Sequence, residues 1–244
     1  TMALRVDGHW PHLGPAAREC WRHTVAARKS SRAGHGPCLA CGQSGLLLDS
    51  LPEPIKSGAI PVATGRGRDA QLVSVNKSAQ GRGGRIQLSD IPICDRCGGQ
   101  ATAVLNALLA EEDHRYRSTD SVTVWWVKNP VAVPLLSSVR TARPDQVAAV
   151  FAELNKARSG YDVTGIDTNA FYALTLSSNQ SRVVVRDWLQ TTLENVVGSV
   201  AAWFDDHRMQ DLHSDEPQYV PLWLMALCLG RGKEEGEEEG WRYT

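Results

Sequence analysis

The sequence has no apolar run of the roughly 18 to 20 residues that a membrane-spanning helix needs. This absence argues against a helical membrane protein and predicts a soluble chain with no membrane partner. Residues 1–30 are charged throughout and lack the apolar segment of a secretory signal peptide. We therefore expect a cytoplasmic location, where thiols stay reduced.

Motifs of the common enzyme classes are also absent. We find no nucleophile elbow, no phosphate loop ending in glycine-lysine-serine or threonine, and no zincin helix. The sequence therefore predicts a protein that is not an enzyme. The less favoured alternative is a metal-dependent nuclease that uses a cluster of acids and histidines near a helix end, where solvated charge is common. That cluster comprises Asp205, Asp206, His207, Asp211 and His213.

Four of the six cysteines form two matching CxxCG turns, at 38–42 and 94–98. The two-residue gap lets both sulfurs of a turn face one ion. We expect the glycine that ends each turn to adopt a backbone conformation that residues with a Cβ avoid. Four thiolates close a tetrahedral site and leave no position for water, so the pattern predicts structural zinc rather than catalytic zinc. The predicted ligands are Cys38, Cys41, Cys94 and Cys97.

Other interpretations of the cysteines stay open. Two disulfides or four unrelated buried thiols would give the same count, and His35 could replace one cysteine as a ligand. Cys20 and Cys228 stand alone and are predicted to be plain buried thiols. The stretch from Gln43 to Ile93 is longer than the gap of a compact zinc ribbon, so we expect a small domain between the two turns.

The formal net charge of −1 hides a strong asymmetry along the chain. Nine lysines and arginines but only three acids lie between Arg28 and Arg85, whereas Lys233 to Glu239 holds five glutamates and one lysine. A basic segment with an acidic tail predicts a polyanionic partner for the first and disorder for the second. The alternative is that the arginines only decorate a soluble surface.

Hydrophobic periodicity predicts a mixture of helices and strands. Helices are expected at 15–29, 100–115, 144–156 and about 187–204, and strands at 46–49, 70–76, 121–127, 170–177 and 182–185. The tryptophans of 121–127 are expected in the core rather than on a base-stacking surface. This order predicts an α+β fold, with a small zinc-stapled module of short strands followed by mixed strands and helices. The expected domains are a basic zinc-knuckle module at 1–130, an α+β module at 131–230 and an acidic, disordered tail at 231–244.

Two glycine-arginine loops, 65–68 and 81–85, lie in the basic segment. Glycine permits close approach of the backbone to a phosphate, and arginine offers a planar fork of donors for phosphate oxygens or a guanine edge. These loops favour nucleic-acid binding, although flexible hairpin tips have the same composition.

The run NAFYALTLSSNQSRVVVRDW at 169–188 closely resembles a segment of the large subunit of type I-C CRISPR Cascade complexes. Further pieces that resemble this family follow in the same order over about 38–204. They are the first cysteine turn, Pro54-Ile55-Lys56, the segment 70–76, the helix around 103–109 and Val124-Trp125-Trp126. The resemblance covers the middle region of the family and indicates a short or divergent form.

The resemblance implies a non-enzymatic subunit of an RNA-guided effector that contacts double-stranded target DNA near its flanking motif. Expected partners are guide RNA, other Cascade subunits and a recruited helicase-nuclease. By position in the sequence, the expected contacts to DNA or guide RNA are Lys56, Arg66, Arg68, Asn76, Lys77, Arg82, Arg85, Asn179, Arg182 and Arg186.

Asn76 is the best candidate for a base contact, because an amide both donates and accepts, but the same side chain could cap a turn. Arg182 and Arg186 lie four apart on a predicted strand and hence on one face, where they would hold a phosphate backbone or a carboxylate such as Asp187. A rival function is a stand-alone zinc-ribbon adaptor that binds another protein and never touches nucleic acid.

Overall fold

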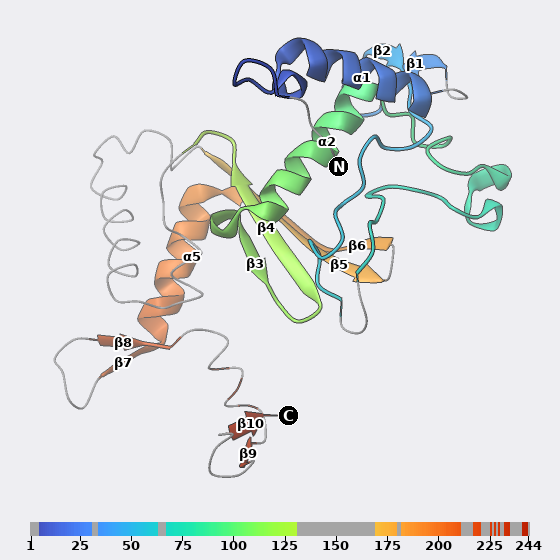
Figure 1. Cartoon of the computed structure of the whole chain (residues 1–244). Helices are drawn as coiled ribbons and strands as arrows, with labels where there is room; N and C mark the ends of the chain where they lie inside the picture. Colours follow the sequence, from blue (N-terminus) through green and yellow to red (C-terminus); the bar gives the residue numbers. More distant parts are fainter. Residues whose placement is uncertain are drawn as a thin grey trace. The chain divides into compact units, whose positions relative to one another are not determined.

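The computed structural model describes residues 5–30, 34–62, 67–130, 169–179 and 182–210, with short stretches beyond 216 (Figure 1). Two compact units are built from interleaved segments of the chain. Unit 1 comprises Thr1–Glu111, Arg117–Val122 and Leu176–Arg186, and unit 2 comprises Glu112–Tyr116, Thr123–Thr175 and Asp187–Thr244.

Unit 1 holds two helices and a small hairpin. Helix α1 spans Pro15–Lys29, as the sequence predicts, and its proline stands at the first helical position, where a missing N–H is harmless. Strands β1 (His35–Pro37) and β2 (Ser44–Leu46) pair antiparallel, and helix α2 spans Asp95–Ala110. Short 3₁₀ turns occupy Pro11–Leu13, Ser78–Gln80 and Arg82–Gly84.

A four-stranded sheet has the order β3-β4-β5-β6. Its strands are β3 (Arg115–Arg117), β4 (Ser121–Val127), β5 (Ala170–Asn179) and β6 (Arg182–Thr192), and a further 3₁₀ turn, Glu112–His114, precedes β3. The Lys128 N–H donates to the Ala170 carbonyl at 2.9 Å, and the hydroxyls of Thr123 and Thr175 lie 2.9 Å apart. Because both pairs share one register, β4 and β5 run antiparallel.

Helix α5 (Leu193–Asp206) supplies the core of unit 2. Trp125 and Phe171 pack against Leu193, Val197 and Ala201 of this helix, and all five are buried. The neighbouring Trp126 belongs instead to a cluster of stacked and tilted rings formed with Tyr172 and Trp188. The prediction of a core position is therefore confirmed for Trp125, while Trp126, which is half-buried, lies in this separate ring cluster.

The helix predicted from about 187 begins at Leu193 instead, because β6 continues through Thr192. Thr192 has extended backbone angles, and its hydroxyl accepts a hydrogen bond from the Asn195 N–H at 3.3 Å. Pairing with β5 keeps the preceding residues in the sheet, and this side-chain cap starts the helix. Strand β5 likewise extends two residues beyond the predicted 170–177.

The strand predicted at 70–76 is wrong. Only Ala70 and Gln71 pair, in isolated bridges to Ile55 and Arg182. Farther along, the Ser74 hydroxyl donates to the Asn76 side-chain oxygen at 2.7 Å, and the Val75 carbonyl accepts one hydrogen bond from the Gln87 N–H at 2.7 Å. The strand predicted at 46–49 is displaced as well, since β2 ends at Leu46.

Helix α2 begins and ends five residues earlier than the predicted 100–115. Leu105 and Leu109 are buried as the pattern requires, but Val104 is 58% exposed and Thr102 takes a buried position. The Thr102 hydroxyl can lie there because it donates to the Gly98 carbonyl at 3.0 Å.

Short strand pairs follow α5. Strand β7 (Arg208–Gln210) pairs with β8 (Pro217–Tyr219), and β9 (Gly232–Glu234) pairs with β10 (Trp241–Tyr243). The helix predicted at 144–156 lies outside the described residues, and the domain boundaries at 130 and 230 and the disorder of 231–244 stay predictions. No described helix is long and apolar enough to cross a membrane.

Candidate metal centre and nucleic-acid interface

The first cysteine turn closes the β1–β2 hairpin. The Cys38 N–H donates to the Gln43 carbonyl at 2.9 Å, and the Gly42 N–H donates to the Cys38 carbonyl at 2.8 Å. Gly42 has φ +72°, the left-handed conformation that side chains disfavour. The predicted reason for a glycine after the second cysteine is confirmed here.

The second cysteine turn is the first turn of α2, with Cys94 as its N-cap residue. Gly98 lies inside the helix, so the backbone reason predicted for it is wrong. A Cβ at Gly98 would lie 2.7 Å from Leu48 Cδ1 and 3.2 Å from Leu51 Cδ2. Glycine is needed here because two buried leucines approach the helix backbone closely.

Backbone hydrogen bonds join the two turns across the long intervening stretch. The Leu39 N–H donates to the Pro92 carbonyl at 2.9 Å, and the Leu48 N–H donates to the Ile93 carbonyl at 3.0 Å. Leu47 and Cys94 form an isolated antiparallel bridge. The hairpin and the start of α2 are thus held in register by backbone contacts, which bring the cysteine pairs together.

The four sulfurs lie within 4.8 Å of one another, as the metal-site prediction requires. Cys38 and Cys94 are buried, Cys97 is half-buried and Cys41 is exposed. Four thiolates at this spacing fit a tetrahedral ion, and zinc is the metal that such a donor set favours. An ion held by this group would have a structural role, because protein ligands would occupy all four coordination positions.

Electrostatics explain why a cation suits this cluster. The backbone N–H of Cys94, 3.3 Å from Cys38 Sγ, leads the contacts that lower the pKa of Cys38 to about 6. The hydrogen bond with Cys94 and burial raise the pKa of Cys97 to about 12, and burial raises the pKa of Cys94. Four adjacent thiols do not ionise together without a positive charge, and a divalent ion supplies that charge.

An ion-pair network connects the second turn to α1. Arg22 donates to the Glu19 carboxylate at 2.7 Å within α1. It also donates at 2.7 Å to the carboxylate of Asp95, which lies 73 residues farther along the chain. Asp95 also lies in the first turn of α2, where the helix dipole favours negative charge. The sequence analysis does not find this network, because nothing in the spacing pairs residue 22 with residue 95.

The structure also bears on His35 as an alternative ligand and on the predicted burial of Cys20. The cysteine set is the one group of three or more potential metal-binding side chains within the described part of the chain, and His35 is not in it. Cys20 is exposed, so the prediction that it is buried is wrong. Cys228 lies outside the described residues.

The nuclease cluster is not assembled among the residues that the structure describes. His207 stacks on Trp203 with ring centroids 4.6 Å apart, and its Nδ1 lies 2.7 Å from the Trp203 carbonyl oxygen. Asp211 and His213 lie outside the described ranges.

The predicted nucleic-acid residues of unit 1 lie mainly on exposed loops. Lys56, Arg68, Lys77 and Arg82 have exposed side chains, whereas Arg66 lies outside the described residues. The loop around Arg68 is tied back to the chain by Ser57, whose N–H donates to Asp69 Oδ1 and whose hydroxyl donates to the Gly67 carbonyl, both at 2.7 Å.

Several side chains that are predicted to contact nucleic acid are bonded to other residues of the protein. Arg85 forms an ion pair with Asp90 at 3.1 Å, and Arg186 donates from Nε to the Ser177 hydroxyl at 2.8 Å rather than pairing with Asp187. The Asn76 side-chain oxygen accepts from the Ser74 hydroxyl at 2.7 Å, a bond between side chains, so both the base contact and the turn cap stay predictions for Asn76.

Arg182 and Asn179 flank the β5–β6 turn. Arg182 is exposed and forms a backbone bridge with Gln71, while the side chain of Asn179 is outside the description. The structure therefore gathers the cysteines into one site but spreads the predicted nucleic-acid residues over several loops and a strand.

Comparison with known proteins gives one family match. Residues 1–239 match the family model of CRISPR-associated protein (Cas_Csd1), which extends beyond the 38–204 region on which the sequence resemblance rests. A search of curated proteins finds no match. The predicted CRISPR-associated, Cascade-type character is confirmed, and the chain belongs to the Cas_Csd1 family of CRISPR-associated proteins.

Proposed function

We propose that this chain is a non-catalytic, large-subunit-like component of a type I-C RNA-guided effector. In this role it binds double-stranded target DNA near the flanking motif and supports assembly with guide RNA and other Cascade subunits. The observation that carries the proposal is the family match over residues 1–239. Recruitment of a helicase-nuclease would place DNA cleavage on another protein, so this chain needs no active site of its own.

Two features of unit 1 support the DNA-binding part. Lys77 and Arg82 flank the 3₁₀ turn Ser78–Gln80 with exposed side chains, and neither forms an ion pair with another described residue. Charges of this kind gain affinity by releasing counterions from phosphates. Arg85 contributes less, because Asp90 already neutralises it.

Strand β6 supports the assembly part. Within unit 1, Val184 and Val185 are 41% and 57% exposed on this strand, which lies at the edge of the sheet among the described strands. Exposed apolar side chains on an edge strand are typical of surfaces that contact another protein. The same observation is what favours the rival adaptor function, in which protein contacts alone would remain.

Co-purification tests the proposal first. Expressed with its genomic neighbours and isolated at moderate salt, the chain should be recovered with guide RNA, partner subunits and one zinc per chain. Recovery alone, with zinc but without RNA or subunits, would contradict the effector role and leave the adaptor.

Salt-dependent binding to duplex DNA tests the contacts. Lys77→Ala with Arg82→Ala should weaken binding and reduce the slope of log K against log salt by about one to two units, since each lost phosphate contact removes roughly 0.9. Arg208→Ala is the control, because this exposed arginine lies in unit 2. An unchanged slope in the double variant would remove this loop from the interface.

A further inference from the structure

Helix α1 has an exposed stripe that the sequence analysis does not assign to any function. Arg18, Trp21, Val25 and Arg28 follow one another at intervals of three and four residues and therefore share one face. Trp21 is 62% exposed, although an indole buries more apolar area than most side chains when it is covered. A helix that presents tryptophan between two arginines to solvent has a face suited to a flat, anionic ligand.

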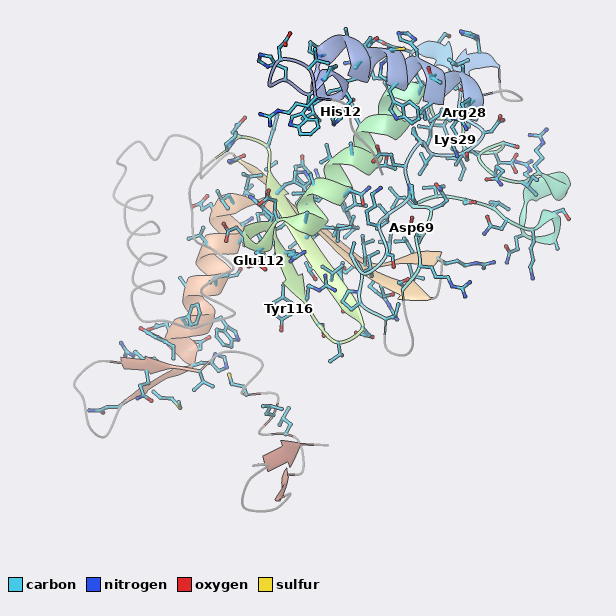
Figure 2. All side chains as sticks on the ribbon, viewed as in Figure 1. His12, Arg28, Lys29, Asp69, Glu112 and Tyr116 are labelled. Carbon is cyan, nitrogen blue, oxygen red and sulfur yellow. The ribbon has the colours of Figure 1, made fainter. Side chains whose placement is uncertain are left out.

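Trp21 lines two hollows, and both are within unit 1. The larger, about 740 Å³, is also lined by Lys56 and Arg96, and the smaller, about 520 Å³, by Lys29. Figure 2 labels Arg28 and Lys29 at the end of α1, and both residues line the smaller hollow. Volumes of this size are in the range of sites for molecules as large as a nucleotide.

The charge around these hollows is predominantly positive. Arg18, Lys56 and Arg96 line the larger hollow and form no ion pair with another described residue. The acids there are Glu53 and Asp95, and Asp95 is already paired with Arg22 at 2.7 Å. The smaller hollow is lined by one acid, Asp49, and by the two cations Arg28 and Lys29. The network of the second cysteine turn thus removes one negative charge from the larger hollow and leaves cations in excess.

We infer that this face of α1 binds a single-stranded segment of nucleic acid, with an unpaired base stacked on Trp21. Arg18, Lys56 and Arg96 hold phosphates at the larger hollow, and Arg28 and Lys29 hold them at the smaller. A duplex hides its base faces, whereas an unpaired base offers one to an aromatic ring. The inference rests on the proposed function, because strands become unpaired when guide RNA opens target DNA.

The test compares two labelled probes by fluorescence anisotropy with the full 244-residue chain. One is a short oligothymidine, and the other has the same backbone without bases. Trp21→Ala should bind oligothymidine roughly tenfold or more weakly and the abasic strand as the parent does, since only base stacking is lost. Trp21→Phe should restore part of the affinity. Arg28→Ala with Lys29→Ala should weaken binding of both probes.

The matched control is Trp10→Ala, which removes another exposed tryptophan of unit 1 and should bind both probes like the parent. Zinc content checks that each variant retains the metal centre. As a second readout, a strand carrying bromouracil should crosslink under ultraviolet light to the peptide that contains Trp21.

Three outcomes would overturn the inference. Trp21→Ala could bind oligothymidine as the parent does, could lose affinity for both probes equally, or could lose a Cascade subunit while keeping oligothymidine, which would make this face a protein interface. Binding to duplex DNA is measured in parallel. A chain that binds duplex but no single strand refutes only this inference, whereas a chain that binds neither also refutes the proposed DNA contacts.

Discussion

Different interactions stabilise the interior of each of the two units. In unit 1, the described part of the stretch between the cysteine turns has little regular structure, and Leu48, Leu51 and Leu88 form a small buried cluster there, with Leu72 and Val73 against it. In unit 2, a helix packs on paired strands through Trp125 and Phe171. From this difference we expect a metal ion at the four cysteines to contribute more to the stability of unit 1 than to that of unit 2, where the described core consists of a helix packed on strands.

We expect the largest effect on stability from removal of two of the four predicted zinc ligands. Cys38→Ser with Cys94→Ser should abolish zinc binding and unfold unit 1, since structural zinc contributes on the order of 10 kcal/mol in small domains. Zinc analysis and near-ultraviolet circular dichroism measure the loss. Cys20→Ser is the control, because this thiol is exposed and outside the cluster. An intact, metal-free fold at neutral pH would refute the zinc centre.

The next effect addresses unit 2. Phe171→Ala should lower the free energy of unfolding by about 3 to 5 kcal/mol, because it opens a cavity beside α5, while zinc content stays unchanged. Denaturation with urea measures the cost. Trp188→Ala, a half-exposed aromatic of the same unit, should cost much less. Loss of zinc in Phe171→Ala would show that the two units are not independently stabilised.

A smaller effect on stability is expected at Gly98, beside the cysteine cluster. Comparison with the neighbouring Gly99 distinguishes the contribution of packing from that of helix propensity. Gly98→Ala should destabilise unit 1 by about 1 to 3 kcal/mol, since the added methyl collides with Leu48. Gly99→Ala is a matched control one residue along α2, where a Cβ meets nothing within 4 Å. It should be stabilising by up to about 1 kcal/mol. Equal effects of the two substitutions would refute the role of close approach.

We expect the smallest effect on stability from the ion pairs of Arg22, which link α1 to the first turn of α2. The hydrogen bond from Arg22 lowers the pKa of Glu19 from 4.5 to about 2. Because the pKa is depressed in the folded protein, the contribution to stability is present above 4.5 and is lost as pH falls toward 2. In NMR spectra the Glu19 carboxyl of the parent should titrate with a midpoint near pH 2, and Arg22→Gln should raise the midpoint toward 4.5. Titration near 4.5 in the parent would contradict the ion pair.

Several elements could be predicted from the sequence because their signals are local. The polar segment that begins at Pro15 forms α1, and the run rich in valine and tryptophan forms β4, and the bounds of both elements match the prediction. The two CxxCG turns identify, without any knowledge of the fold, the four cysteines that the structure brings together and that could hold a metal ion, because the two-residue gap places the two sulfurs of each turn close to each other.

Other elements depended on partners distant in the sequence. Residues 187–192 have a pattern that suits a helix, but pairing with β5 keeps them in β6. Conversely, 72–76 alternate like a strand but belong to no strand in the described structure, where the Val75 carbonyl accepts a single backbone hydrogen bond from the Gln87 N–H at 2.7 Å.

The sequence by itself thus determined the family, the α+β class and the four cysteines, since each rests on residue type and short spacing. Only the tertiary structure decided that Gly98 is needed for close packing, that Arg22 neutralises Asp95, and that an exposed Trp21 lines two basic hollows. The physical reason is that burial, ion pairing and exposure depend on which distant segments meet, and residue spacing does not specify those meetings.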